Sequence, residues 1–195
     1  MKSAMVSIFT ATLSVVFLQS CIKETNQPAT SASSESIVAS IHFIGEHFGG
    51  GIIFYIDSIN KHGIIAAEAD IEEPAVWAYE DTLTRAKGTA IGYGGKNTSR
   101  ILRVQGDPVN QAEDYAALEC AEFELNGYSD WYLPSKDELN ELYKQKNVVG
   151  GFRTIAYWSS SEFNLTAAWF QNFSNGSQVK AGKKGSYALR PVRYF

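Results

Sequence analysis

Three lysines and two aromatic residues near the C-terminus have side chains suited to binding an anion or a sugar. Lys180, Lys183 and Lys184 come directly after a predicted hairpin, and Trp169 and Tyr187 lie on either side of them. Ammonium groups attract anionic partners, and large aromatic side chains anchor contacts that are partly apolar and partly wet. We therefore expect these five residues to bind a polyanionic or carbohydrate partner.

The net charge of the chain is −4, but the charges are unevenly distributed. Residues 21–143 carry eight Lys and Arg against twenty Asp and Glu, a balance of −12. Residues 144–195 carry eight Lys and Arg against Glu162 alone, a balance of +7. Such asymmetry indicates either an exposed basic surface or acidic and basic segments that neutralise each other within the fold. Internal neutralisation is the simpler explanation, and the basic surface is the functional one.

Few side chains have the spacing of a catalytic or metal-binding group. His42, His47 and His62 form no i, i+4 pair and have no cysteine nearby in sequence, so the pattern indicates no metal site. Cys120 lies in a helical apolar pattern and is expected to be a small buried side chain rather than a nucleophile. The acidic residues between positions 70 and 81 are typical of a solvated face. We therefore expect no enzymatic activity and no cofactor.

The first twenty residues have the layout of a bacterial secretory signal. Lys2 precedes an uncharged, mostly apolar run from Ala4 to Leu18, which is too short to span a membrane as a helix. The run ends in Leu18-Gln19-Ser20-Cys21, which resembles a bacterial lipobox. We expect residues 1–20 to be removed and Cys21 to be acylated, which anchors the protein in a membrane.

The position and surroundings of the anchor lead to four further expectations. An aspartate directly after the lipidated cysteine favours retention at the inner membrane. Ile22 occupies that position here, so we expect the protein in the outer membrane, on either its periplasmic or its surface face. Residues 21–40 lack apolar spacing and are expected to form a disordered tether. Residues 41–195 have the length of one globular domain. A lipid-anchored protein of net negative charge is not expected to bind nucleic acid.

The domain is predicted to begin with a β-hairpin and to continue through two helices. The hairpin comprises strands at 51–57 and 63–67, and the glycine-rich segment 88–98 is predicted to be a turn-rich loop because it lacks the pattern of a phosphate-binding loop. The first helix is predicted over 108–125, where Asp107 caps it and Asn126-Gly127 closes it. The second is predicted over 136–145.

The last third of the chain is predicted to be mainly strands. These lie around 157–160, around 169–173 and over 188–195, and Asn175-Gly176 indicates a hairpin turn between Phe173 and Val179. The expected fold class is α+β, with C-terminal antiparallel strands.

An aromatic loop leads into the second helix, and its start is well specified. In Gly127-Tyr128-Ser129-Asp130-Trp131-Tyr132-Leu133-Pro134-Ser135, the final serine stands three residues before Glu138, which is the spacing of a capping box. Two later segments echo its composition. These are Tyr157-Trp158-Ser159-Ser160-Ser161 and Leu189-Arg190-Pro191-Val192-Arg193.

Taken together, these segments resemble the Lcl C-terminal domain family, named for the end domain of a bacterial collagen-like adhesin. The resemblance implies a C-type-lectin-like fold in which the first and last strands lie close together. It also implies a set of signature residues with structural roles. These are Gly127, Asp130, Trp131, Leu133, Pro134, Ser135, Glu138, Trp158, Ser159, Ser160, Arg190, Pro191, Val192 and Arg193.

The resemblance implies a cell-surface binding or adhesion module whose partner is a glycan or a surface protein. The triplets of calcium-dependent lectins are missing, because Glu73-Pro74 is followed by Ala75 and no Trp-Asn-Asp occurs. Enzymes of this fold rely on a cysteine pair that a chain acylated at Cys21 lacks. Two alternatives remain open: an envelope enzyme or processing factor with unrecognised chemistry, and a structural subunit of a surface assembly.

Overall fold

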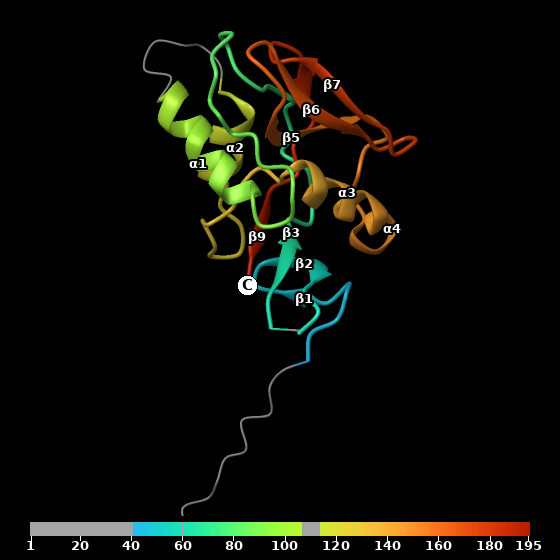
Figure 1. Ribbon diagram of the computed structural model, residues 1–195. Coiled ribbons are helices and arrows are strands. Elements are labelled where there is room, and N and C mark those ends of the chain that lie inside the picture. The colour runs from blue at the N-terminus through green and yellow to red at the C-terminus, as the bar shows by residue number, and fades with distance from the viewer. Residues whose placement is uncertain (1–40, 60, 107–113) are drawn as a thin grey trace, which may run out of the picture. The chain divides into compact units, whose positions relative to one another are not determined.

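The computed structural model describes residues 41–59, 61–106 and 114–195, which belong to one compact unit. Its elements follow one another in this order: β1 (His47–Phe48), β2 (Gly51–Ile56), β3 (Gly63–Ala66), β4 (Ala75–Val76), α1 (Gly94–Gln105), α2 (Ala116–Glu122), α3 (Lys136–Lys144), α4 (Lys146–Val149), β5 (Ala156–Glu162), β6 (Ala167–Asn172), β7 (Gln178–Gly182), β8 (Ser186–Tyr187) and β9 (Val192–Tyr194). The architecture is therefore mixed, with antiparallel sheets and four helices in the described part of the chain (Figure 1).

The first hairpin and the last strand share one antiparallel sheet of order β1-β2-β3-β9. Ile52 pairs with Ala66 across the hairpin, and Ile65 pairs with Arg193 of β9. This arrangement confirms the predicted hairpin and places the beginning and end of the domain in one sheet, with β3 between them (Figure 1).

The residues of β2 form this strand because they are apolar on both faces. Ile52 and Phe54 pack into a core with Leu139 and Leu142 of α3, whereas Ile53 faces a smaller cluster that contains Trp131. A run that is apolar at successive positions suits a strand covered on both sides. The sheet is thus held between α3 and the aromatic loop that precedes it.

A second sheet of order β5-β6-β7 lies beside the helices. The turn between β6 and β7 contains Asn175-Gly176, with Gly176 at φ 80°, as the hairpin signal predicts. Trp158 of β5 is completely buried in a third core cluster with Trp77, Tyr115 and Cys120. The prediction that Cys120 is a buried apolar side chain is confirmed, and burial raises the pKa of its thiol.

Helix α3 begins where the sequence predicts. The Ser135 side chain accepts a hydrogen bond from the backbone N–H of Glu138, and the Glu138 carboxylate accepts one from the backbone N–H of Ser135 at 2.8 Å. This reciprocal pair completes the capping box. The helical segment ends with α4 before Gly150, which has φ 74°.

Helix α1 replaces part of the predicted glycine-rich loop. It begins at Gly94, where only glycine fits, because a Cβ atom at this position would lie 2.2 Å from the Glu138 carboxylate. Buried Asn97 exchanges hydrogen bonds with the backbone of Gly88, and buried Thr98 does so with that of Leu133. Tertiary contacts therefore stabilise a helix that the local sequence does not indicate, because helix propensity alone predicts helices only weakly.

Of the helix predicted over 108–125, the described residues 114–125 contain α2, which is shorter than predicted at both of its ends there. It begins at Ala116, because Tyr115 is extended, and ends at Glu122; the expected cap at Asp107-Pro108 lies outside the described residues. Asn126-Gly127 does not close it. With φ values of 53° and 82°, this pair forms a two-residue turn between Leu125 and Tyr128, whose backbones exchange hydrogen bonds.

Candidate ligand-binding site

Four side chains gather on the face of the β5-β6-β7 sheet that adjoins the start of α3. The Lys136 Nζ lies 4.7 Å from the centre of the Trp169 ring, and the Lys180 Nζ lies 5.6 Å from it. The Phe163 ring meets Trp169 edge to face at 5.7 Å and lies 4.0 Å from the Lys180 Nζ. We name these four residues the aromatic–lysine cluster.

The sheet register fixes two members of the cluster. Trp169 of β6 is directly opposite Lys180 of β7, so both side chains project from the same face. Phe163 follows β5 in a tight turn, where its N–H donates to the carbonyl of Ala167. The Asn164 side chain secures that turn by accepting from the backbone of Thr166 and Ala167.

The helix start fixes the fourth member. The backbone N–H of Lys136 donates to Ser161 Oγ at 2.9 Å, and its carbonyl accepts from the Gln178 side chain at 2.8 Å. Lys136 is therefore tied to both β5 and β7, although it belongs to α3. This lysine was not among the predicted site residues, because its neighbours in space are far from it in sequence.

The aromatic–lysine cluster is accessible to a ligand. Phe163 and Lys180 are exposed, and Trp169 and Lys136 are half-buried. A lysine ammonium over an aromatic ring is attracted to it by about 0.5–1 kcal/mol at an exposed site, and this attraction restricts the conformations of the lysine side chain. The cluster thus combines a partly exposed indole with two positive charges at defined positions.

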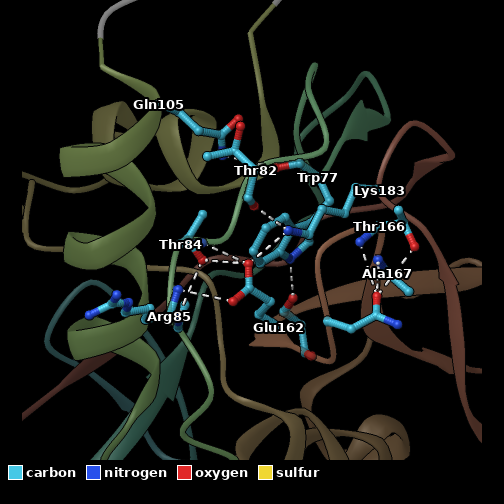
Figure 2. Close-up of polar contacts among 12 residues, drawn as sticks. Trp77, Thr82, Thr84, Arg85, Gln105, Glu162, Thr166, Ala167 and Lys183 are labelled. Atoms are coloured by element: carbon cyan, nitrogen blue, oxygen red, sulfur yellow. Dashed lines mark hydrogen bonds and ion pairs between the residues drawn. The ribbon is translucent and has the colours of Figure 1, made fainter.

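Lys183 lies elsewhere, contrary to the expectation of an exposed lysine trio. Its side chain is completely buried, and its Nζ donates to Glu162 Oε1 and to the carbonyl of Thr82, both at 2.7 Å (Figure 2). Its ammonium also lies 4.7 Å from the Trp77 ring. Because a buried carboxylate requires compensation, Lys183 serves Glu162 and is not available to a ligand.

Glu162 ties a distant loop to the end of β5. Its Oε1 accepts from the Thr84 N–H at 2.8 Å and from the Thr84 hydroxyl at 3.1 Å, and its Oε2 accepts from the Arg85 N–H at 2.9 Å (Figure 2). Arg85 adopts φ 61°, a left-handed conformation that is uncommon for a side-chain-bearing residue. The loop before α1 is thereby held by a buried ionic network.

Two other predicted ligand-binding residues also lie outside the aromatic–lysine cluster. Tyr187 is half-buried, and its ring packs 4.5 Å from Trp158 and 4.9 Å from Phe170. Lys184 is exposed in the turn that follows β7. Of the five residues predicted, Lys180 and Trp169 are thus the pair that the structure brings together.

The signature residues lie mostly inside the domain. Glu138 is completely buried and accepts hydrogen bonds from the Gly92 backbone at 2.8 Å and the Tyr194 hydroxyl at 2.6 Å, in addition to its capping role. Trp158 is buried and donates to the carbonyl of Ala75 at 3.1 Å. Trp131 is also buried and donates to that of Tyr128. The other buried members are Leu133, Pro134, Ser135, Ser159, Ser160, Arg190, Pro191, Val192 and Arg193.

Two arginines of the closing segment pair with aspartates from earlier in the chain. Arg190 is completely buried; its Nε donates to Asp70 Oδ1 at 2.8 Å, and its Nη2 donates to the carbonyl of Gly151 at 2.6 Å. Arg193 forms a bidentate pair with Asp130 at 2.6 and 2.9 Å. Arg153 also contacts Asp70. Three basic residues after position 144 therefore neutralise earlier acidic ones, as the simpler explanation of the charge asymmetry predicts.

A second basic surface, not foreseen from the sequence, follows α1 and the loop before it. Residues 82–106 contain five basic residues and no acidic ones. Four of the five are exposed and Arg100 is half-buried, with its guanidinium donating to the carbonyl of Arg85 at 3.4 Å. The five are Arg85, Lys87, Lys96, Arg100 and Arg103. The overall excess of acidic residues before position 143 conceals this local concentration of positive charge.

The described residues match neither the pattern of a membrane-spanning helix nor that of a metal-binding cluster. Among the described residues, no helix is long and apolar enough to cross a membrane. Within those same residues, His, Cys, Asp and Glu nowhere gather in threes at metal-binding distance.

Comparisons with known proteins place the chain in a family. No curated protein matches it. It is similar to the crystal structure of a fimbrial protein from Bacteroides ovatus ATCC 8483, with 15% identity and a TM-score of 0.46. That match covers 67% of this chain but 35% of the fimbrial chain, so it spans about a third of the latter. The model of the Lcl C-terminal domain matches residues 70–193, and the chain therefore belongs to the Lcl C-terminal domain family.

Proposed function

We propose that the protein is a bacterial cell-surface binding module, used in adhesion, that recognises a polyanionic or carbohydrate partner. The observation that carries the proposal is the aromatic–lysine cluster, in which the ammonium groups of Lys136 and Lys180 lie 4.7 and 5.6 Å from the centre of the Trp169 ring. The partly exposed indole offers an apolar contact, and the two ammonium groups near it offer positive charge. A sulfated or carboxylated sugar has both an apolar ring face and anionic groups, and so fits this combination.

The proposed fold is C-type-lectin-like. Its support is the antiparallel sheet that joins the β2-β3 hairpin to β9, together with the long intervening segment that carries the helices and the second sheet. In this proposed arrangement the intervening segment, which includes the β5-β6-β7 sheet, forms the ligand-binding surface. The proposal includes no catalytic activity, because the buried thiol of Cys120 is inaccessible and its pKa is raised by burial.

The proposed anchor is an acylated Cys21 in the outer membrane. Its support is the apolar run that ends in Leu18-Gln19-Ser20-Cys21. Mass spectrometry of protein extracted from membranes is expected to give an acylated peptide that begins at Cys21. An unmodified peptide containing Cys21 contradicts the anchor.

A glycan array with sulfated and neutral sugars, probed at low and high salt, tests the binding function. Exposed charges are screened over about 8 Å at physiological ionic strength, so binding is expected to weaken strongly as salt rises. Lys180→Ser and Trp169→Ala are each expected to weaken it at least tenfold. Lys184→Ser is the matched control, because it removes an exposed lysine outside the cluster.

Three outcomes are informative. Equal losses for Lys180→Ser and Lys184→Ser mean that net charge, rather than the cluster, drives binding. A loss confined to Arg100→Ser and Arg103→Ser transfers the site to the basic surface of α1. Absence of binding to every sugar contradicts the carbohydrate partner.

A further inference from the structure

Five large apolar residues are exposed at the end of the domain where the chain enters it. Ile41 is 81% exposed, Phe43 is 63% and Ile59 is 65%, and Ile44 and Phe48 are also exposed. Among the described residues, a third of the exposed large apolar side chains fall within this stretch of nineteen positions. We name Ile41, Phe43, Ile44, Phe48 and Ile59 the entrance patch. Contiguous exposed apolar side chains mark a contact surface more often than scattered ones do.

The backbone beneath the entrance patch is ordered by hydrogen bonds to β2. The Gly45 N–H donates to the Ile53 carbonyl at 2.8 Å, and the Ile53 N–H donates to the Glu46 carbonyl at 2.9 Å. The Glu46 N–H donates to the Phe43 carbonyl at 3.2 Å, which closes the turn that carries Ile44. Exposure of these side chains is therefore a property of a fixed segment.

Aromatic contacts join the two parts of the entrance patch. The His42 ring lies 4.2 Å from Phe48 and 5.0 Å from Phe195. The Phe195 carbonyl accepts from the N–H of Gly63, at the base of the turn that carries Ile59. Segment 41–48 and the β2-β3 turn thus lie at one end of the sheet, as Figure 1 shows.

The charges near the entrance patch suit a neutral partner. Residues 41–60 contain no lysine or arginine. The carboxylate of Glu46 is bound to the His42 ring at 3.1 Å, and that of Asp57 accepts hydrogen bonds from the backbone of its own turn, at Ile59 and Lys61. Lys61, exposed at the end of the β2-β3 turn, is the lysine closest in sequence to the patch, and the five apolar side chains favour an apolar surface.

The short length of chain between Cys21 and the entrance patch indicates that the patch lies near the membrane. Nineteen residues lie between Cys21 and Ile41, and a flexible chain of that length spans about 25 Å on average. Acyl chains inserted at Cys21 therefore hold the patch within a few nanometres of a bilayer, at a high effective concentration of lipid. A contact too weak to bind membranes by itself then becomes populated, because burial of apolar side chains at the interface adds to the anchor.

We propose that the entrance patch lies against the lipid bilayer in which Cys21 is anchored, and that the domain is thereby docked with one end on the membrane. This inference rests on the proposed anchor. It concerns the orientation of the domain, which neither a flexible tether nor the ligand specifies. Docking of this kind directs the opposite end of the domain, with its β5-β6-β7 sheet, away from the lipid.

The test uses the full chain, purified with its lipid and reconstituted in zwitterionic vesicles that contain doxyl-labelled lipid. Acylation blocks Cys21 and Cys120 is buried, so one introduced cysteine is the reactive thiol. Phe43→Cys and Ile59→Cys are labelled with a nitrobenzoxadiazole dye, and Leu165→Cys, an exposed apolar position beyond the end of β5, is the matched control. The dye is expected to be quenched at least threefold more at 43 and 59 than at 165, with the same result at 0.1 and 1 M salt.

The outcomes separate this proposal from the anchor. The intact mass of the protein is measured first. If Cys21 is not acylated, both the proposed anchor and the proposed docking are overturned. With Cys21 acylated, equal quenching at 43 and 165 overturns the docking and leaves the anchor intact. A third outcome is that the dye at position 43 is shielded from aqueous iodide but is not quenched by the lipid label. If that shielding increases with the density of protein in the vesicles, the patch contacts a second copy of the chain, and docking on the membrane is overturned. Loss of glycan binding has no bearing on any of these results.

Discussion

The Nζ of Lys183 lies 2.7 Å from Oε1 of Glu162, and both side chains are completely buried. The pair joins β7 to the end of β5 and, through Thr82 and Thr84, to the loop before α1. Removing one partner from such a pair leaves an uncompensated charge inside the protein. A completely buried ion pair of the fold therefore includes a residue that the sequence suggested for ligand binding.

Lys183→Met is expected to destabilise the domain by about 3–5 kcal/mol, because Glu162 then remains buried without a cation. Urea unfolding followed by tryptophan fluorescence measures the loss. Glu162→Gln added to Lys183→Met is expected to recover part of it. Lys184→Met, in the exposed turn, is the control and should change stability by less than 0.5 kcal/mol, as is usual at the surface. A loss below about 1 kcal/mol for Lys183→Met contradicts the buried pair.

Ser135→Ala is expected to cost about 1 kcal/mol, because the N–H of Glu138 loses its capping acceptor. The Ser135 hydroxyl also donates to the carbonyl of Ala90 at 3.0 Å, so the loss should not fall below that figure. Unfolding in urea is again the measurement. Ser129→Ala, at an exposed position in the same aromatic loop, is the control. Equal stability of the two variants rejects the capping role.

The Asp130–Arg193 pair is expected to give stability that depends on acid pH. The hydrogen bond from Arg193 lowers the pKa of Asp130, so the folded protein holds this proton less tightly than the unfolded chain does. The contribution is present above the ordinary aspartate pKa of about 4 and is lost as the pH falls below it. The Asp130 side chain is 60% exposed, so solvent limits the effect to about 0.2–1 kcal/mol.

Unfolding free energies at pH 7 and pH 3 measure this dependence. Asp130→Asn should reduce the difference between the two pH values and should destabilise the protein mainly at pH 7. An unchanged pH difference in Asp130→Asn shows that other carboxylates are responsible for it.

Three tyrosines are expected to ionise late in an alkaline titration. Burial raises the pKa of Tyr132, Tyr157 and Tyr194; the hydroxyl of Tyr157 also bonds to Asp70, and that of Tyr194 lies beside the negative Glu138. Their folded pKa values exceed the ordinary value of about 10, so their contribution to stability is present below pH 10 and is lost above it.

Absorbance at 295 nm follows this ionisation. The chain has ten tyrosines, and the native protein is expected to show at least three fewer tyrosinates than the protein in guanidinium near pH 11. Tyr194→Phe should reduce that deficit by one. Identical titrations of the native and unfolded protein contradict the burial of these hydroxyls.

Features that depend on neighbouring residues could be predicted from the sequence. The cap at Ser135, the turn at Asn175-Gly176 and the β2-β3 hairpin each rest on a short pattern with one physical meaning. Helix α1 could not be predicted, because Gly94 and Asn97 are poor helix formers that are held by Glu138 and by the backbone of Gly88. Those partners are 44 and 9 residues away.

The candidate site shows the same division. The β6-β7 hairpin brings Lys180 to Trp169, so a local turn signal was sufficient to pair them. The burial of Lys183 depends on Glu162, on the loop that carries Thr82, and on Trp77, and nothing in the spacing of three lysines distinguishes it from its neighbours. Lys136 was missed for the corresponding reason, since it reaches the site from another element.

The place of β1 at the edge of its sheet determines how the domain responds to tension. A force applied at Ile41 first meets the hydrogen bonds of Gly45 and Glu46 with Ile53. It then reaches β1, which pairs with β2 at two positions, His47 with Ile52 and Phe48 with Gly51. Peeling this strand releases about ten residues, or roughly 35 Å of extended chain, before β2 is loaded. In a protein anchored at Cys21, as we propose, the entry segment thus acts as an extension that lengthens under tension while the β5-β6-β7 sheet keeps its shape.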